Sequence, residues 1–223
     1  GTISVTADVA GEVLAVSPAP EISGRVRVTE TGPKKRLEGV RVILTRLSDV
    51  GFQVHELQSD ISGRFRSPKP LRPDSYAITN VHSLPEDCYV SEITLDGQQI
   101  SPESFEIRAS GNLEIVLAGT AGQITGSVSS ADGKPSQRAV VTLIPEGAQS
   151  WPAKKVADDA GSFHFLNLRP GKYTLWAWEE VDEVQWRDPE HRKKYEGRAT
   201  EITIGASERR NVPLRVIAED EMK

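Results

Sequence analysis

Two of the four tryptophans stand in a segment whose residue types suggest a binding surface. Tyr173, Leu175 and Ala177 alternate with Trp176 and Trp178. Successive side chains of a strand point to opposite faces, so the two indoles share the face that Tyr173 does not occupy. If Tyr173 faces a core, both indoles face outward, where they could stack on sugar rings or anchor a protein partner.

A second interpretation of this aromatic group involves Trp186. The segment 186–195, WRDPEHRKKY, predicts one short helix near residues 188–195, with Pro189 in its first turn and basic residues toward its end. Such a helix could cover the indoles. The sequence therefore leaves two alternatives open: a ligand-binding set of Trp176, Trp178 and Trp186, or an aromatic face that is covered by the chain itself.

Other residue types that carry chemistry are scattered. The histidines show no HxxE, HExxH or HxH spacing, and the single cysteine, Cys88, supplies neither a disulfide nor a CxxC pair. The chain also lacks a G-x-S-x-G elbow and a P-loop. We therefore expect no catalytic residues, no metal site and no cofactor, and we expect that the protein is not an enzyme.

The elements that must position these side chains are strands. Apolar and polar residues alternate at period two in eight stretches, and turn signals such as 132–135 (DGKP) and 169–171 (RPG) separate them. This pattern predicts an all-β protein built of antiparallel β-sandwiches rather than βαβ units. The stretches begin near Ile22, Val40, Leu113, Ile124, Val141, Tyr173, Ile202 and Val212.

The sequence is internally duplicated. Residues 22–26 (ISGRV) match 124–128 (ITGSV), 60–65 (DISGRF) match 158–163 (DDAGSF), and 71–78 (LRPDSYAI) match 168–175 (LRPGKYTL). In each copy the glycine of the first block permits a bulge or a close strand crossing, and the second block is a turn that ends in an aromatic residue. Two copies of one β-domain explain this order best.

The duplication sets the expected boundaries. We expect an N-terminal strand segment at 1–17, which could close a preceding repeat, a first sandwich at 18–119, a second at 120–218 and a charged, frayed tail at 219–223. The link 119–122 (GTAG) is short, so the two sandwiches should sit at a restrained angle.

Composition excludes several partners. The 223-residue chain carries a net charge of −5, which argues against nucleic acid as a partner, because that affinity comes largely from clustered Lys and Arg. No apolar run approaches the roughly 20 residues that cross a bilayer, so we expect no membrane insertion by this segment. The chain begins at Gly1 without Met, which is typical of a processed or excised piece. We expect a monomer.

The repeated blocks resemble the carboxypeptidase regulatory-like domain family. The resemblance rests on Gly126/Val128, Ala139/Val141/Leu143, Asp158/Gly161/Phe163 and Leu168/Pro170/Gly171/Tyr173/Leu175, and it covers about residues 20–218. It implies a transthyretin-like or Ig-like sandwich, grouped with carbohydrate-binding-like folds, in tandem repeats like those of large bacterial envelope proteins. The first copy is looser, with Asp74 where the family prefers Gly.

The resemblance implies a function without catalysis. It indicates a structural or interaction module, of spacer or adhesion type, in a larger extracytoplasmic protein that is periplasmic, outer-membrane-associated or secreted. Its partners would be neighbouring domains of the parent chain, and a glycan or surface protein is also open. The alternative is a carbohydrate-binding accessory module that uses Trp176, Trp178 and Trp186.

Overall fold

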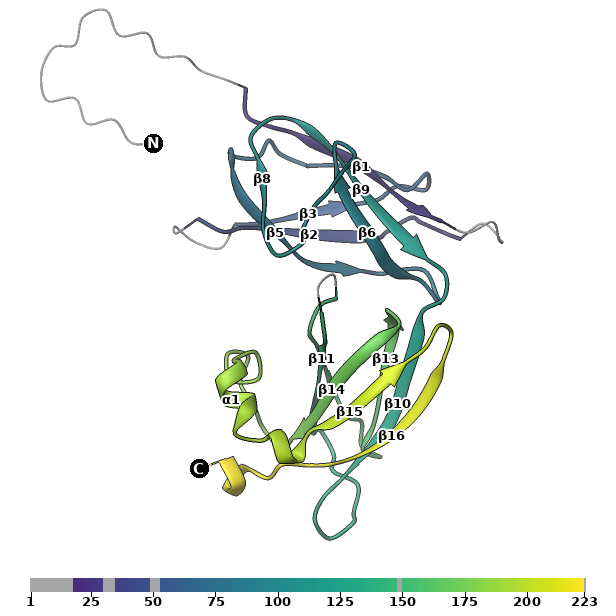
Figure 1. The fold of residues 1–223 in the computed structure, drawn as a ribbon, viewed down its shortest axis with the longest axis vertical. Coiled ribbons are helices and arrows are strands. Elements are labelled where there is room, and N and C mark those ends of the chain that lie inside the picture. Colours follow the sequence, from purple (N-terminus) through teal and green to yellow (C-terminus); the bar gives the residue numbers. More distant parts are fainter. Residues whose placement is uncertain (1–17, 30–34, 49–52, 148–149, 223) are drawn as a thin grey trace, which may run out of the picture.

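The computed structural model describes residues 18–29, 35–48, 53–147 and 150–222. The expected N-terminal strand segment, 1–17, lies outside the described residues. Two β-sandwiches follow one another along the long axis of the molecule (Figure 1), so the all-β sandwich class is confirmed. We call them the first sandwich, which holds strands β1 to β9, and the second sandwich, which holds β10 to β16.

The first sandwich is made of a five-stranded and a four-stranded sheet. The five-stranded sheet has the order β4-β1-β9-β6-β7, and the facing sheet has the order β3-β2-β5-β8. The strands are β1 (Ile22–Val28), β2 (Arg41–Arg46), β3 (Val54–Gln58), β4 (Arg64–Arg66), β5 (Asp74–His82), β6 (Tyr89–Leu95), β7 (Gln98–Gln99), β8 (Phe105–Ile107) and β9 (Gly111–Ala118).

The second sandwich repeats this topology with fewer strands. Its sheets have the orders β13-β10-β16 and β12-β11-β14-β15. The strands are β10 (Gly122–Ser129), β11 (Val140–Pro145), β12 (Ala153–Val156), β13 (Ser162–Leu168), β14 (Gly171–Trp178), β15 (Thr200–Ile204) and β16 (Arg209–Arg215), and the helical segments are α1 (Pro189–Lys193) and the 3-10 turns Glu196–Arg198 and Glu219–Met222.

The pairing departs from the antiparallel expectation at one place in each sandwich. The first and last strands pair in parallel, β1 with β9 and β10 with β16. Parallel neighbours need a long connection, and here the strands of the facing sheet form part of it in both sandwiches. The alternation of apolar residues does not distinguish parallel from antiparallel partners, which is why the sequence missed this pairing.

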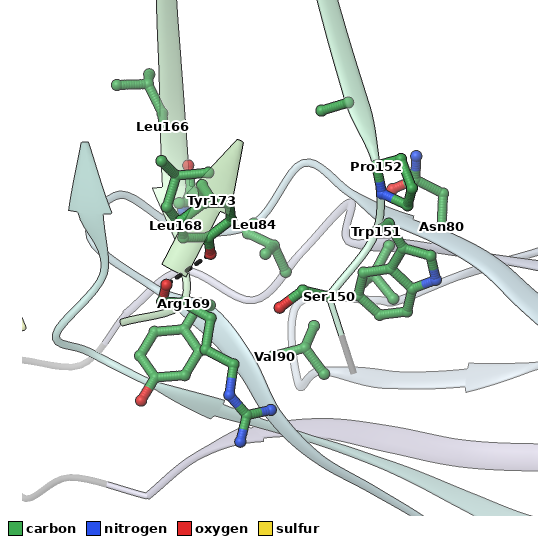
Figure 2. A pocket seen from close by; sticks show the side chains of 14 residues that line it. Asn80, Leu84, Val90, Ser150, Trp151, Pro152, Leu166, Leu168, Arg169 and Tyr173 are labelled. Carbon is green, nitrogen blue, oxygen red and sulfur yellow. Dashed lines mark hydrogen bonds between the residues drawn. The ribbon is translucent and has the colours of Figure 1, made fainter. Parts of the chain in front are cut away.

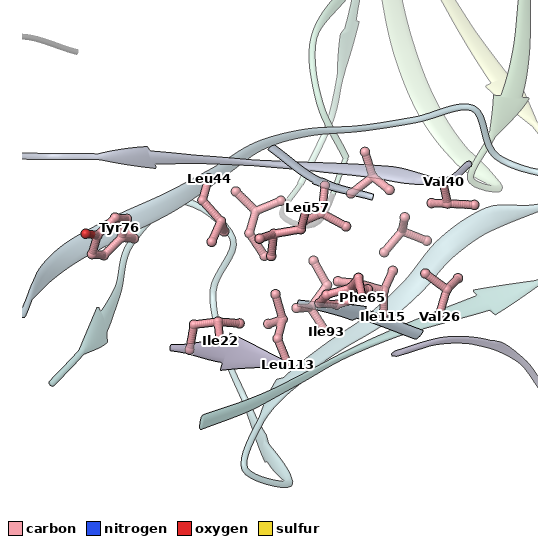
Figure 3. Close-up of a cluster of buried hydrophobic side chains, with 14 of the residues drawn as sticks. Ile22, Val26, Val40, Leu44, Leu57, Phe65, Tyr76, Ile93, Leu113 and Ile115 are labelled. Carbon is pink, nitrogen blue, oxygen red and sulfur yellow. The ribbon is translucent and has the colours of Figure 1, made fainter. Parts of the chain in front are cut away.

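Each sandwich encloses its own hydrophobic core. Inward-facing residues of both sheets meet in the first sandwich, with Ile22, Val26, Leu113 and Ile115 on one sheet and Leu44 on the other (Figure 3). The second core has equivalent residues, including Ile124, Val128, Val141 and Leu143.

The repeated sequence blocks have the same local geometry in both copies. Asp60 accepts hydrogen bonds from two backbone N–H groups of its turn, and Asp158 does the same. The hydroxyl of Tyr76 donates to the carbonyl of Arg72 at 2.9 Å, and that of Tyr173 donates to the carbonyl of Arg169 at 2.6 Å. The duplication therefore extends from sequence to side-chain hydrogen bonds.

The glycine of the first block lies under the aromatic residue of the second. A Cβ built on Gly24 would lie 2.7 Å from the Phe65 ring, and one on Gly126 would lie 2.4 Å from the Phe163 ring. Of the two roles that the sequence allows this glycine, the structure shows the close crossing: a phenyl ring from the neighbouring strand rests on the glycine.

The predicted short helix is present as α1. The Asp188 side chain caps it by accepting a hydrogen bond from the Glu190 backbone N–H at 3.0 Å, and Pro189 occupies the first turn. The C-terminal segment differs from the frayed tail that we expected. Residues 219–222 form a 3-10 turn, and Glu221 pairs with Arg198.

Candidate functional site

The three tryptophans that the sequence singles out are buried. Trp176 is 7% exposed, and Trp178 and Trp186 are 0% exposed. The segment 179–199 follows β14 directly and includes α1, and we call it the covering segment. It places α1 beside the sheet that contains β11 and β14 (Figure 1). Of the two sequence alternatives, the structure corresponds to the covered face, in which the indoles present no ring to solvent for a sugar to stack on.

Specific contacts hold the cover on this face. The Trp176 indole N–H donates to the carbonyl of Tyr195, in the covering segment, at 3.1 Å. The Trp178 N–H donates within the sheet, to the Thr142 hydroxyl of β11, at 2.9 Å. The ring of Tyr195 packs edge-on against Trp178, with the ring centroids 5.2 Å apart. Buried indoles usually find such hydrogen-bond partners. The cluster therefore has the properties of a small additional core.

Charged groups surround the third indole, Trp186. The Arg187 guanidinium lies over its ring, 4.3 Å from the centroid, a cation–π arrangement. Hydrogen bonds from Lys154 and then Arg187 lower the pKa of Glu183 to about 2. The Glu183 carboxylate thus stays ionised across the physiological pH range, and its ion pair with Lys154 links β12 to the covering segment.

A different site emerges where the two sandwiches meet, and we call it the junction. Two loops and a strand end contribute to it: the loop before β6, the loop before β12 and the end of β13 (Figure 2). Side chains of the second sandwich reach backbone carbonyls of the first. The residues that line the cavity between them include Asn80, Leu84, Tyr89, Val90, Ser150, Trp151, Leu168 and Tyr173.

Trp151 makes one of these contacts. Its indole N–H donates to the carbonyl of Ile78 at 2.7 Å, and its ring packs against the hydrophobic core of the first sandwich. β8 pairs with β5 only over residues 74–76, so the Ile78 carbonyl lies beyond that ladder. In the second sandwich the equivalent residue, Leu175, pairs with Thr200 of β15. Trp151 thus supplies the donor that a strand supplies in the other copy.

Asn167 makes the second contact. Its amide nitrogen donates to the carbonyls of Pro85 and Cys88, at 2.7 and 2.6 Å. Asn167 has a φ of 60°, and the register of β13 against β10 shifts beside it. Asparagine tolerates this left-handed conformation better than most residues. The bulge turns the side chain away from the ladder and toward the first sandwich.

The third contact fixes the link itself. Asp87 accepts a hydrogen bond from the Ala121 backbone N–H at 2.9 Å through its carbonyl, and one from the Gln123 side chain at 3.2 Å through its carboxylate. Ala121 is buried. The short link is therefore tied to a loop of the first sandwich before β10 begins.

The junction leaves a cavity of about 160 Å³. Burial raises the pKa of Tyr173, which lines it, to about 12, so the phenol remains a neutral hydrogen-bond donor. Small-molecule sites usually enclose about 300–1,000 Å³, so this cavity is too small for most substrates. Its lining, with Leu84, Val90 and Trp151, fits a packed contact between two bodies.

The described part of the chain contains neither a cluster of potential metal ligands nor a helix that could span a membrane. Among those residues, no group of three or more His, Cys, Asp and Glu side chains could hold a metal ion. No helix among them has the length and apolar character needed to span a bilayer, and α1 has five residues.

Comparisons with known proteins give only distant likenesses. No family model matches the chain, and no curated protein matches it. The Bacillus anthracis TIE protein is 14% identical at a TM-score of 0.30, over 90% of this chain and 34% of its own. The minor pilin GBS52 of Streptococcus agalactiae is 14% identical at 0.35, over 88% and 95%. The shaft pilin SpaA of Lactobacillus rhamnosus GG is 10% identical at 0.33, over 88% and 96%. The chain thus spans about a third of the first of these proteins, and scores this low support no functional argument.

Proposed function

We propose that this chain is a non-catalytic spacer and interaction module of a larger bacterial extracytoplasmic protein. Its task is geometric: the two sandwiches act as one stiff unit that holds neighbouring domains of the parent chain at a set distance. The carboxypeptidase regulatory-like sequence blocks support the module class and the extracytoplasmic setting. The junction supports the stiffness, and it is the observation that carries the proposal.

The stiffness follows from the kind of contacts at the junction. A flexible link would leave the facing carbonyls to water, whereas here Trp151, Asn167 and the Ala121 N–H each reach a carbonyl of the first sandwich. Each such hydrogen bond contributes about 1 kcal/mol net. Because these contacts come from separate segments near the link at residues 119–122, a change in the angle between the sandwiches requires some of them to break.

The glycan-binding alternative has no support in this structure. It needs exposed indoles at Trp176, Trp178 and Trp186, and the covering segment buries all three. The interaction half of the proposal therefore rests on the sheet faces and loops rather than on the aromatic cluster.

Small-angle X-ray scattering of the full chain tests the proposal. The wild type should fit one fixed arrangement of the two sandwiches, and the double variant Trp151→Ala/Asn167→Ala should require an ensemble of bent and extended forms. Asn211→Ala, an exposed change on β16, serves as the control and should scatter like the wild type. A wild type that already needs an ensemble would contradict the proposal.

A further inference from the structure

The outer face of the five-stranded sheet in the first sandwich carries four arginines. Arg25 and Arg27 lie on β1, and Arg64 and Arg66 lie on β4. Arg25 stands directly opposite Arg64 in the ladder between the two strands. The side chains of Arg25, Arg27 and Arg66 are 59%, 41% and 71% exposed. We call these four residues the arginine face.

Acidic neighbours neutralise part of this charge. Glu114 on β9 pairs with both Arg25, at 2.6 Å, and Arg27, at 3.1 Å, while Glu21 pairs with Arg66. Two carboxylates thus serve three guanidinium groups, and one of the carboxylates is shared. These pairs restrain the three arginine side chains, which nevertheless stay largely exposed to solvent.

The fourth arginine has no such partner. Arg64 forms no ion pair among the residues that the structure describes, and it faces the like charge of Arg25. Like charges directly opposite in a ladder destabilise a sheet. Glu92 of β6 occupies the same face as Arg27 but lies across Val116, on the far side of β9. The half of the face over β4 and β1 therefore keeps an excess of positive charge.

The fold does not require these arginines, because the second sandwich forms the same strands without them. Superimposing the Gly–Phe crossing of β1 and β4 on that of β10 and β13 gives the equivalent residues. They are uncharged or weakly basic: Ser127, Ser129, Ser162 and His164. The arginine face is thus an addition to the first sandwich that brings cross-strand repulsion and that the shared fold does not require.

We propose that the arginine face binds a linear polyanion that presents repeated carboxylate or phosphate groups. Guanidinium groups bind both kinds of oxyanion through paired N–H donors. Along a strand the arginines recur about every 7 Å, and between strands about every 5 Å, so an extended polymer can meet several at once. Because the chain as a whole has a charge of −5, binding of a polyanion would depend on this local excess of positive charge rather than on the net charge.

Titration calorimetry on the full chain tests this binding. The probes are polygalacturonate for carboxylate, poly(glycerol phosphate) for phosphate and dextran as the neutral polymer. We expect at least one polyanion to bind and dextran not to bind. Arg25→Ser/Arg64→Ser, which installs the residues of the second sandwich, should weaken that binding about tenfold or more at low salt and make the salt dependence shallower by about two counterions.

The matched control removes two exposed arginines elsewhere. Arg209→Ser/Arg210→Ser changes the net charge equally on β16 of the second sandwich and should leave the affinity within about twofold. Which polyanion responds identifies the oxyanion that the face prefers. Binding of neither polyanion overturns the proposal, and so does an equal loss in both double variants. Thermal unfolding of each variant shows whether its fold is intact.

Discussion

At the residue scale, the strand glycines under the phenyl rings are the positions where side-chain size decides the fold. A Cβ on Gly126 would lie 2.0 Å from the Val212 carbonyl as well as against the Phe163 ring. Neither backbone nor a packed ring can move aside cheaply. The recurrence of this arrangement at Gly24 shows that both copies depend on it.

Gly126→Ala should therefore destabilise the protein by about 2 kcal/mol or more, measured by urea unfolding. Gly171→Ala is the matched control, because nothing lies within 4 Å of its built Cβ and its φ is not positive. The control should stay within about 0.5 kcal/mol of the wild type. Equal effects of the two changes would show that the ring crossing is not the cause.

The position of His55 holds a different residue in the second copy, and this difference affects how the stability of the protein depends on pH. Burial, and then the nearby Arg46 charge, lower the pKa of His55 below 6.5. The unfolded chain therefore takes up this proton at a higher pH than the folded chain does. The contribution of His55 to the free energy of unfolding is fully present above about pH 6.5. It decreases as the pH falls from 6.5 through the lower pKa of the folded state.

His55→Ala installs the residue of the second sandwich, because Ala153 faces Leu143 as His55 faces Leu44. We expect the variant to lose less melting temperature than the wild type between pH 7 and pH 5. His164→Ala, at an exposed position of β13, should keep the wild-type slope. An unchanged slope in His55→Ala would contradict the assignment.

At the element scale, the sequence predicted more about strands than about their partners. Alternation located β1, β10 and β14, and Pro189 in the first turn with basic residues toward the end located α1. The junction was not predicted, because its contacts join residues that are remote in sequence. One signal was available for Asn167: a polar residue of low strand propensity between Leu166 and Leu168 is typical of a bulge.

The covering segment predicts how the tryptophans respond to solvent. Iodide should quench mainly the fluorescence of Trp151, because this indole is half-buried whereas the other three are at most 7% exposed. Trp151→Phe should therefore remove most of the quenching. Strong residual quenching in that variant would show that the cover over Trp176 and Trp178 opens in solution.

The two sandwiches differ in whether their last strand has a neighbour on the side away from the first strand. In the first, β6 pairs with β9 and Thr94 stands opposite Glu114. In the second, β16 has no neighbour on that side among the described strands, and Pro213 occupies the position of Glu114. Hydrogen bonds from Gln123 N to Glu208 O and from Val216 N to Ser129 O place the even-numbered residues toward β10. Pro213 thus faces the open edge, where it removes a donor.

Pro213→Thr should make this edge competent for pairing with a second chain. We expect concentration-dependent dimers by analytical ultracentrifugation, and we expect the wild type to remain a monomer. Asn211→Thr is the control, since it lies on the same edge and keeps its N–H before and after the change. A variant that stays monomeric at all concentrations would mean that the proline does not protect the edge.

At the scale of the whole molecule, the contacts at the junction are not interchangeable between the copies. The second sandwich donates through Trp151 and Asn167, and the first accepts through backbone carbonyls. The first sandwich has Gln53 and Pro70 at the donor positions when the repeated blocks are aligned. The order of the two sandwiches is therefore built into the residues at the junction.

The most direct test of the stiff-spacer function is a measurement of backbone residual dipolar couplings of the full chain in a weakly aligning medium. If the junction makes one rigid body, a single alignment tensor should fit the couplings of both sandwiches in the arrangement described here. Two tensors of different magnitude or orientation would show that the sandwiches move independently, and would contradict the stiff-spacer function.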